Sequence, residues 1–367
     1  MDSLVFSNML HRPARTVVSV LGIAVGVLLI VFTVGLTNGT MRERGQRESN
    51  VGAEIFFRAS GSLGLTGNES FRLPIGLKDE LRKVEGVSTV VSLGQTTVTA
   101  KDTNAGSRLI DGVEYIEYES VVGIAVKAGR ALGMSGDEAV IDSGFQRQKN
   151  LQVGDKTNLF ERDFTIVGIY EPAAGARVKI PLATMQEQLG GEGKVTAYLV
   201  KINEGLDPKP VAERLSQRFP GNQILLTSEI PELYMQGFPA MNVFLNVFIG
   251  VAAVISALVI LLTMYTTVTE RTRQIGIMKS LGMSNGKIAW TIAQEAILLS
   301  FLGVVTGIVL TFAVRALLTQ VTTLEVEMSP FVLGITLIVG LIGGAIGSLY
   351  PAMRAARLDA VEALSYE

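Results

Sequence analysis

The sequence has no cysteine, a single histidine and few charged residues, and each shortage excludes a class of site. Of the 367 residues, 18% are charged and the formal net charge is −2. Without cysteine, disulfides and thiolate metal sites are excluded in any compartment. The one histidine, His11, stands beside Arg12 near the N-terminus, which predicts an interfacial residue. A histidine metal site or a Ser-His-Asp triad further along is therefore excluded, and nothing indicates nucleic-acid binding.

Nucleotide-binding and hydrolase motifs are also absent. The stretch 282–287 (GMSNGK) has one residue too few between its glycines for a phosphate-binding loop, and Ile288 stands where a magnesium-binding Ser or Thr is needed. No G-x-S-x-G or H-E-x-x-H occurs. We therefore predict no enzyme activity and no catalytic, cofactor or metal residue in this chain, so energy for any work has to come from a partner.

What the chain does contain is four long apolar runs. Each exceeds the roughly 20 residues that a helix needs to cross a bilayer core, and Glu295 is the one charged residue within them. They are residues 16–37, 240–269, 288–314 and 328–353. The first run is too long for a signal-peptide core and no clear cleavage site follows, so it predicts a retained anchor. The fold class is thus an α-helical membrane protein with four spans.

The basic residues near the span ends predict the orientation, because cytoplasmic flanks carry more Lys and Arg. One side collects the larger set: Arg12, Arg15, Arg271, Arg273, Lys279, Lys287, Arg354 and Arg357. The other side collects the smaller set: Arg42, Arg44, Arg47 and Arg315. We therefore expect both termini in the cytoplasm and the polar region 38–239 outside it, in a bacterial cell (inner) membrane.

The large polar region reads as a mixed α/β domain. Residues 53–58, 77–84 and 87–93 read as strand, helix and strand. The same order recurs at 195–202, 210–219 and 223–226, which predicts two related halves. Between them, 104–185 contains short strands and glycine turns, including 138–142, 156–160 and 164–170, and reads as an inserted β subdomain.

The remaining segments connect these parts. The order predicted from the sequence is an interfacial helix or disordered tail 1–15, the outer domain 38–239, a cytoplasmic segment 270–287, an external loop 315–329 and a tail 354–367. Within the outer domain, 38–50 and 229–239 read as two stalks that join it to the first and second spans. A flexible linker after Asn50 is then expected to decouple the domain from the membrane.

Glycines four residues apart recur in the spans, a spacing that lets helices approach closely in lipid. They are Gly22, Gly26, Gly303, Gly307, Gly340, Gly343, Gly344 and Gly347. Packing within one chain and contact in a dimer both fit this pattern.

The segment 270–287 (ERTRQIGIMKSLGMSNGK) predicts a short amphipathic helix that ends at Gly282. Ile275, Met278 and Leu281 are expected on one face, with polar residues on the others. Such a helix either docks in a groove of a soluble partner or lies on the headgroups, and the residues alone leave both open.

A family resemblance bears on that choice. Residues 270–282 resemble the ER-x-x-EIG-x-x-K-A-x-G signature of the MacB/FtsX-like ABC transporter permeases, a mechanotransmitting (type VII) family. Residues 350–367 (YPAMRAARLDAVEALSYE) resemble its closing motif, and 7–26 its opening. The order of one span, a large outer domain and three spans is also similar. Gln274 replaces the usual Glu and Ala360 the usual Pro.

The resemblance implies a permease bound to soluble ABC ATPase subunits, which hold the ATP and magnesium, and paired with a second permease. It implies ATPase coupling through Glu270, Arg271, Arg273, Gln274, Ile275, Gly276, Met278, Lys279, Leu281 and Gly282. It implies a cytoplasmic C-terminal motif of Tyr350, Pro351, Arg354 and Arg357. A periplasmic adaptor or outer-membrane channel would fit export or efflux of a lipophilic or periplasmic substrate. The alternatives are a signalling subunit that activates an extracytoplasmic partner such as a cell-wall hydrolase, and a membrane-anchored binding domain without an ATPase.

Overall fold

A computed structural model describes residues 13–59, 71–99, 107–236, 239–321, 324 and 326–358. The expected N-terminal interfacial helix lies almost entirely outside the described residues, as does most of the tail 354–367. The chain divides into two compact units, one of residues 1–39 and 239–367 and the other of residues 40–238. This division separates the predicted membrane part from the predicted outer domain.

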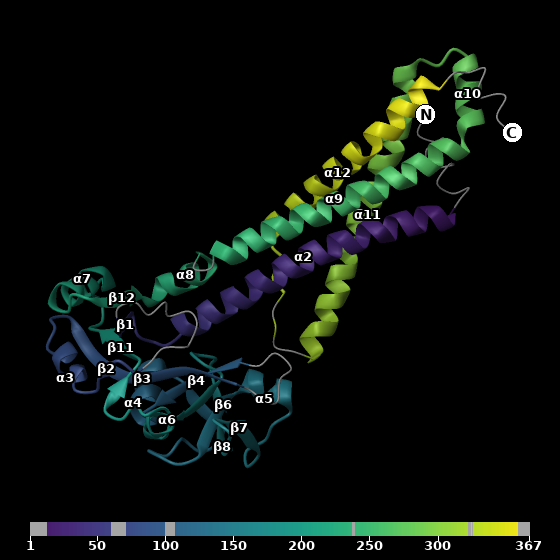
Figure 1. Cartoon of the computed structure of the whole chain (residues 1–367). Coiled ribbons are helices and arrows are strands. Elements are labelled where there is room, and N and C mark those ends of the chain that lie inside the picture. Colours follow the sequence, from purple (N-terminus) through teal and green to yellow (C-terminus); the bar gives the residue numbers. More distant parts are fainter. Residues whose placement is uncertain are drawn as a thin grey trace. The chain divides into compact units, whose positions relative to one another are not determined.

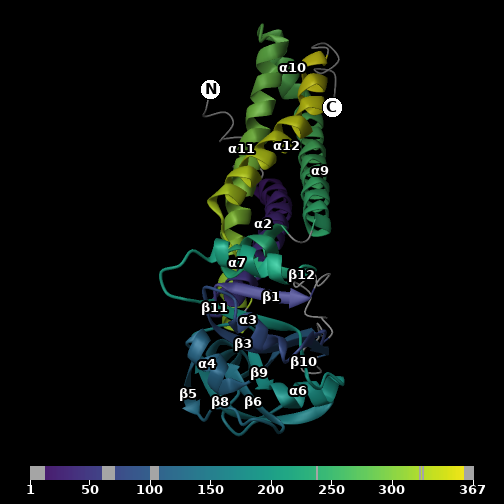
Figure 2. The same cartoon turned by 90° about the vertical axis from the view of Figure 1, so that its left-hand side faces the viewer.

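The first unit is helical. Four of its helices are long and apolar enough to cross a membrane: α2 (Pro13–Ser49), α9 (Pro239–Glu270), α11 (Asn285–Val321) and α12 (Pro330–Arg357). A shorter helix, α10 (Thr272–Ser280), joins α9 to α11. Helix α12 packs against both α9 and α11 (Figures 1 and 2). Each long helix extends past its apolar run, because helical hydrogen bonding continues into the polar ends of the segment.

Buried apolar side chains hold these helices together. Ile23, Val27 and Val31 of α2 pack with Ile260 and Met264 of α9. Residues from α11 join the same cluster, namely Ala296, Leu299 and Val304. The opposite faces of α2 and α9 leave large apolar side chains exposed, as expected where lipid is the solvent.

The second unit is built on one ten-stranded sheet with the order β12-β1-β11-β3-β4-β9-β6-β8-β5, with β7 pairing β8. Its strands are β1 (Ile55–Ala59), β3 (Val87–Thr99), β4 (Ser107–Val113), β5 (Ala125–Gly129), β6 (Glu138–Asp142), β7 (Lys156–Leu159), β8 (Arg162–Glu171), β9 (Val178–Pro181), β11 (Ala197–Ile202) and β12 (Asn222–Leu226). A two-stranded sheet pairs β2 (Leu73–Pro74) with β10 (Lys194–Val195).

The two predicted halves are present and are interleaved. Helix α3 (Leu77–Arg82) connects β1 to β3, and α7 (Pro208–Arg218) connects β11 to β12. Strand β11 lies between β1 and β3, and β1 lies between β11 and β12, so each half inserts a strand into the other. This split arrangement of two strand–helix–strand units makes the halves one body that neither half could form alone.

The inserted region differs from the expected β subdomain in two respects. It contains the helices α4 (Tyr115–Val122), α5 (Ser143–Lys149) and α6 (Leu182–Leu189). Its strands also continue the sheet of the two halves, because β4 pairs both β3 and β9. Helix α4 buries residues 115, 118, 121 and 122, and this spacing places all four on one face of a helix.

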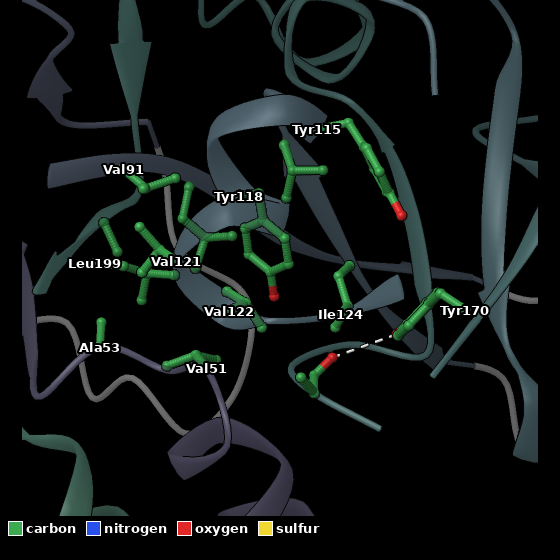
Figure 3. Packing of buried hydrophobic residues seen from close by; sticks show 14 of the residues in the cluster. Val51, Ala53, Val91, Tyr115, Tyr118, Val121, Val122, Ile124, Tyr170 and Leu199 are labelled. Atoms are coloured by element: carbon green, nitrogen blue, oxygen red, sulfur yellow. Dashed lines mark hydrogen bonds between the residues drawn. The ribbon is translucent and has the colours of Figure 1, made fainter. Parts of the chain in front are cut away.

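The main core of the second unit spans both regions. It joins Val91 and Leu199 of the interleaved halves to Tyr118, Val122 and Tyr170 of the inserted region (Figure 3). Both tyrosines are fully buried, and the hydroxyl of Tyr170 donates to the carbonyl oxygens at 174 and 176. The shared core explains why the inserted region is not a separate domain.

The two predicted stalks are helical. Residues 40–49, the last turns of α2, belong to the second unit, and the return leg forms a 3₁₀ turn (Thr227–Glu229) followed by α8 (Ile230–Gln236). A Cβ atom built on Gly45 would lie 2.6 Å from the Cα atom of Pro231. The backbones of the two stalks are therefore in contact at this point, and any side chain larger than that of glycine at position 45 would collide with Pro231.

Candidate functional site

The predicted cytoplasmic segment forms the helix α10, and its predicted stop at Gly282 is confirmed. Gly282 has a φ of +88°, in the left-handed region that glycine adopts without strain. The amide of Gly282 donates to the Lys279 carbonyl at 3.0 Å, and the amide of Met283 donates to the Met278 carbonyl at 3.1 Å. These bonds close α10 and turn the chain into α11.

The apolar residues of α10 do not share one exposed face. Ile275 is 4% exposed and packs into a cluster with Val268, Ile288 and Ala355, and Met278 packs against it. Leu281, by contrast, is 82% exposed. The expectation of a common face fails because six residues at about 100° each place Leu281 on another side from Ile275. Ile277, which is 44% exposed, lies four residues before Leu281 and therefore shares the exposed face of α10 with it.

Basic residues of this segment attach it to the other helices. The Arg271 guanidinium lies 3.3 Å from the carboxylate of Glu295 on α11. The Lys279 ammonium donates to the carbonyls of Ala356 at 2.9 Å and Leu358 at 2.6 Å, where α12 ends. A cation there satisfies carbonyls that have no helical donor and faces the negative end of the helix dipole. We call these contacts and the Ile275 cluster the coupling cluster.

The other predicted coupling residues lie around the cluster. Gly276 is buried, whereas Glu270, Arg273 and Gln274 are exposed. Within the described residues, the outward surface of α10 thus combines Arg273 and Gln274 with the apolar side chains of Ile277 and Leu281.

The C-terminal motif reaches the same region through α12. The Arg354 guanidinium lies 4.6 Å from the ring centre of Tyr265 on α9, and Pro351 is buried within α12. Tyr350 and Arg357 are exposed. Lys279 of the 270–282 motif hydrogen-bonds to the end of α12, so it joins that motif directly to the C-terminal motif, about 80 positions away in sequence.

Sequence reasoning missed three residues that hold this site together. Glu295 is 7% exposed and pairs with Arg271. Its isolation as the one charge among the apolar runs was the available signal, since a charge there needs a partner. Ala355 and Val268 gave no signal, because small and apolar residues are common throughout the spans.

The predicted glycines all face other helices of the same chain. A Cβ atom on Gly303 would lie 2.6 Å from Ile23, and one on Gly307 would lie 2.7 Å from the backbone oxygen of Ala24. On α2, Gly22 faces Val259 and Gly26 faces Ser256. On α12, Gly340 faces Val304, Gly344 faces Ser300 and Gly347 faces Ala257. Gly343 lies 3.8 Å from the Ala253 carbonyl. These contacts fit the prediction of packing within one chain.

A further close contact was not predicted. The amide of Glu327, in the connection between α11 and α12, donates to the carbonyl of Gly35 on α2 at 2.8 Å. A Cβ atom on Gly35 would lie 2.7 Å from the Glu327 carbonyl oxygen. The connection thus rests on the backbone of α2 within the first unit.

Two family models match this architecture. The FtsX-like permease C-terminal family matches residues 246–360, which hold α10 and the end of α12. The MacB-like periplasmic core domain family matches residues 16–218, which hold α2 and most of the sheet. The chain belongs to the MacB/FtsX-like ABC transporter permeases. With its four apolar helices, it is a multi-pass inner-membrane protein.

Curated relatives agree with this assignment. The macrolide export ATP-binding/permease protein MacB of Campylobacter jejuni is 25% identical over 99% of this chain and 61% of the relative. The uncharacterized ABC transporter permease YknZ of Bacillus subtilis is 23% identical over 99% of this chain and 98% of the relative. The chain spans about three-fifths of the length of the MacB relatives that it matches.

Two solved structures resemble about half of this chain. The periplasmic region of MacB from Actinobacillus actinomycetemcomitans is 18% identical, covers 50% of this chain and 93% of that structure, and gives a TM-score of 0.39. The extracellular domain of YknZ is 16% identical over 47% of this chain and 99% of that structure, with a TM-score of 0.36.

Proposed function

We propose that this chain is the permease subunit of an ABC transporter complex and has no ATPase site of its own. A separate soluble ATPase would bind ATP and magnesium and push on α10. The permease would convert that push into movement of its extracytoplasmic domain and so export or extract a lipophilic or periplasmic substrate. The YknZ relative, which this chain matches over nearly its whole length, is named as a permease, and this supports the proposal.

The coupling cluster is the observation that carries the proposal. Helix α10 presents Ile277 and Leu281 outward, while Arg271 and Lys279 fasten it to α11 and α12. An apolar helix face of this size suits a hydrophobic groove on a soluble partner. Because α10 is attached at both of its ends, a displacement of α10 would be passed to three long helices.

The polarity of the long helices supports transport outside the bundle. The hydroxyls of Ser300, Thr311 and Thr336 are buried and donate to carbonyls of their own helices four residues earlier. They therefore supply no polar lining for a central path, and substrate would be handled by the outer domain. We propose cytoplasmic termini, a second permease as partner and, for export across an outer membrane, an adaptor or channel.

The docking step is tested by placing a charge on α10. Leu281→Asp combined with Ile277→Asp puts carboxylates where an apolar groove is expected, and we expect the ATPase to be lost on copurification while the permease still inserts. Met134→Asp is the matched control, because Met134 is 89% exposed but lies in the outer domain. Undiminished binding of the ATPase to the double variant would reject α10 as the docking helix.

A further inference from the structure

The end of α2 is held in the outer domain by buried charges. The Arg47 side chain, 8% exposed, lies 2.6 Å from the carboxylate of Asp142 and donates from Nε to the Gly175 carbonyl at 3.0 Å. The Gly175 amide donates back to the Arg47 carbonyl at 2.8 Å. Arg47 is thus bound through both side chain and backbone, and both partners belong to the inserted region.

A second pair reinforces this attachment one turn earlier. Arg177 donates to Glu43 at 2.6 Å and lies 3.6 Å from Asp142. The side chains of Glu43 and Arg177 are about one-fifth exposed, whereas Asp142 is almost fully buried. Residues 43 and 47 lie on one face of the helix, and that face is bound to the inserted region.

The neighbouring residue, Glu48, binds elsewhere. Its carboxylate accepts a hydrogen bond from the hydroxyl of Tyr234 on α8 at 2.6 Å and lies 3.7 Å from the Arg58 guanidinium on β1. All three side chains are buried. Two consecutive residues of opposite charge therefore hold different parts: Arg47 the inserted region, and Glu48 the interleaved halves and the second stalk.

These contacts close into a ring across the sheet. Arg58 donates to Gln95 on β3 at 3.2 Å, and Gln95 donates to Asp111 on β4 at 3.1 Å. Asp111 also accepts from the amide of Ala176 at 2.8 Å. Ala176 follows Gly175, the partner of Arg47, so the path returns to α2.

Lys179 fixes the last part of the ring. Its ammonium, fully buried, lies 3.2 Å from Asp111 and 4.9 Å from the ring centres of both Tyr118 and Tyr170. It donates to the carbonyls at 174 and 176 at 2.9 and 3.0 Å, so it holds the loop that binds Arg47. Burial lowers the pKa of Lys179, and the charge of Asp111 opposes that effect. Figure 3 shows the two tyrosines within the surrounding apolar cluster.

We propose that this ring, together with the neighbouring Glu43–Arg177 pair, is a clasp that makes the inserted region follow α2, so that Arg47 and Glu43 are the positioning residues through which the first span moves the outer domain. The inference rests on the proposed function, since it names the contact by which the movement of α2 is delivered. Buried ion pairs are poor stabilisers compared with apolar packing, but they fix one geometry. A closed ring of buried ion pairs and hydrogen bonds at the end of a helix suits force transmission better than it suits stability.

The test uses the full-length permease with its ATPase in lipid nanodiscs and measures amide hydrogen exchange with ADP and with ATP. In Arg47→Met we expect the amides at 175 and 176 to exchange about tenfold faster or more. Their own acceptors remain, but the loop loses the Arg47 side-chain bond to the Gly175 carbonyl and should open more often. We also expect the ATP-dependent change in the inserted region to disappear while ATP hydrolysis continues. Arg130→Met is the matched control, because Arg130 pairs with Glu138 at the surface of the same region.

The outcomes separate the clasp from the proposed function. If the wild-type complex shows no ATP-dependent change in the outer domain, the proposed function fails. If the wild type changes and Arg47→Met changes equally, the clasp is rejected. Should Arg47→Met fail to fold, Glu43→Gln removes the partly exposed pair alone and is expected to weaken the same ATP-dependent change. An unaltered response in Glu43→Gln would then reject the clasp.

Discussion

The two units of this protein achieve close packing by different means. In the membrane unit, helices meet at glycines, and Gly303 and Gly307 leave no room for even one carbon atom against α2. In the second unit, residues 40–238, the end of α2 is held by charged side chains that are almost fully buried. In the second unit, the hydrophobic effect stabilises the fold and can offset the free-energy cost of burying charged groups. Lipid provides no such driving force between helices, so the membrane helices depend on close approach of their backbones. The next four predictions test this contrast, from the largest expected effect to the smallest.

The largest effect is expected in the membrane unit. Gly307→Leu would force four carbon atoms against Val27 and the Ala24 backbone. Overpacking typically costs about 1–3 kcal/mol, and we expect at least the upper end here because part of the contact is backbone. We expect α2 to separate from α11 and the protein to melt at a much lower temperature in detergent. Gly250→Leu is the control, because no other helix approaches within 4 Å of its Cβ position. Equal melting of the two variants would refute tight packing at Gly307.

An effect of similar size is expected from one charge of the clasp. Asp111→Asn leaves the buried Lys179 ammonium without its carboxylate, which typically costs about 3–5 kcal/mol. Proteolysis of the outer domain in the full-length protein should accelerate accordingly. Asp137→Asn removes an exposed pair with Arg162 and should cost less than about 1 kcal/mol. Comparable proteolysis rates for the two variants would contradict the burial argument.

The coupling cluster should respond more mildly. Lys279→Met removes two hydrogen bonds and a cation from the end of α12, together worth about 1–3 kcal/mol. We expect the ATPase to bind but to be stimulated less by the permease. Lys287→Met changes an exposed lysine near the start of α11 and serves as the control. If stimulation is unchanged in Lys279→Met, the link between the 270–282 motif and the end of α12 has no role in coupling.

The smallest effect concerns acid sensitivity. The hydrogen bond from Arg130 lowers the pKa of Glu138, so the native state favours the carboxylate. This contribution is present above the ordinary glutamate pKa and is lost as the pH falls through the lowered value. Glu138→Gln should therefore slightly flatten the acidic limb of a melting-temperature profile. A steeper limb in the variant would show that the sign of this linkage is wrong.

The fold was largely predictable because its signals are periodic. The runs at 240–269 and 328–353 and the strand–helix–strand repeats follow from local patterns, and β6 was placed at 138–142 as the structure has it. The helices of the inserted region were missed because α4 and α5 are only eight and seven residues long. Patterns that short do not separate a helix from a strand among glycine turns.

The site was predictable in position but not in orientation. The motif at 270–282 was found, yet Ile275 is buried where an exposed face was expected, because helix spacing alone does not say which side meets the bundle. The clasp left no sequence signal at all. Arg47 and Glu48 sit in a polar stretch typical of an exposed stalk, and their partners at 142, 175 and 234 are distant in sequence.

The contacts of the clasp change the position in α2 at which a flexible linker is expected to decouple the two units, from Asn50 to Gly39. A linker after Asn50 leaves Arg47 and Glu43 attached to the inserted region, whereas a linker after Gly39, at the boundary of the two units, separates the clasp from the span. The two insertions thus differ only in whether α2 reaches the clasp as one helix.

The most direct measurement compares these two linkers in the assembled complex. A flexible Gly/Ser segment is inserted after Gly39 or after Asn50, and ATP-dependent amide exchange is followed in the inserted region together with ATP hydrolysis. The account predicts that hydrolysis persists in both, that the outer response is lost with the linker after Gly39, and that it is retained with the linker after Asn50. Retention in both, or a loss confined to the linker after Asn50, would contradict transmission through α2 and its clasp.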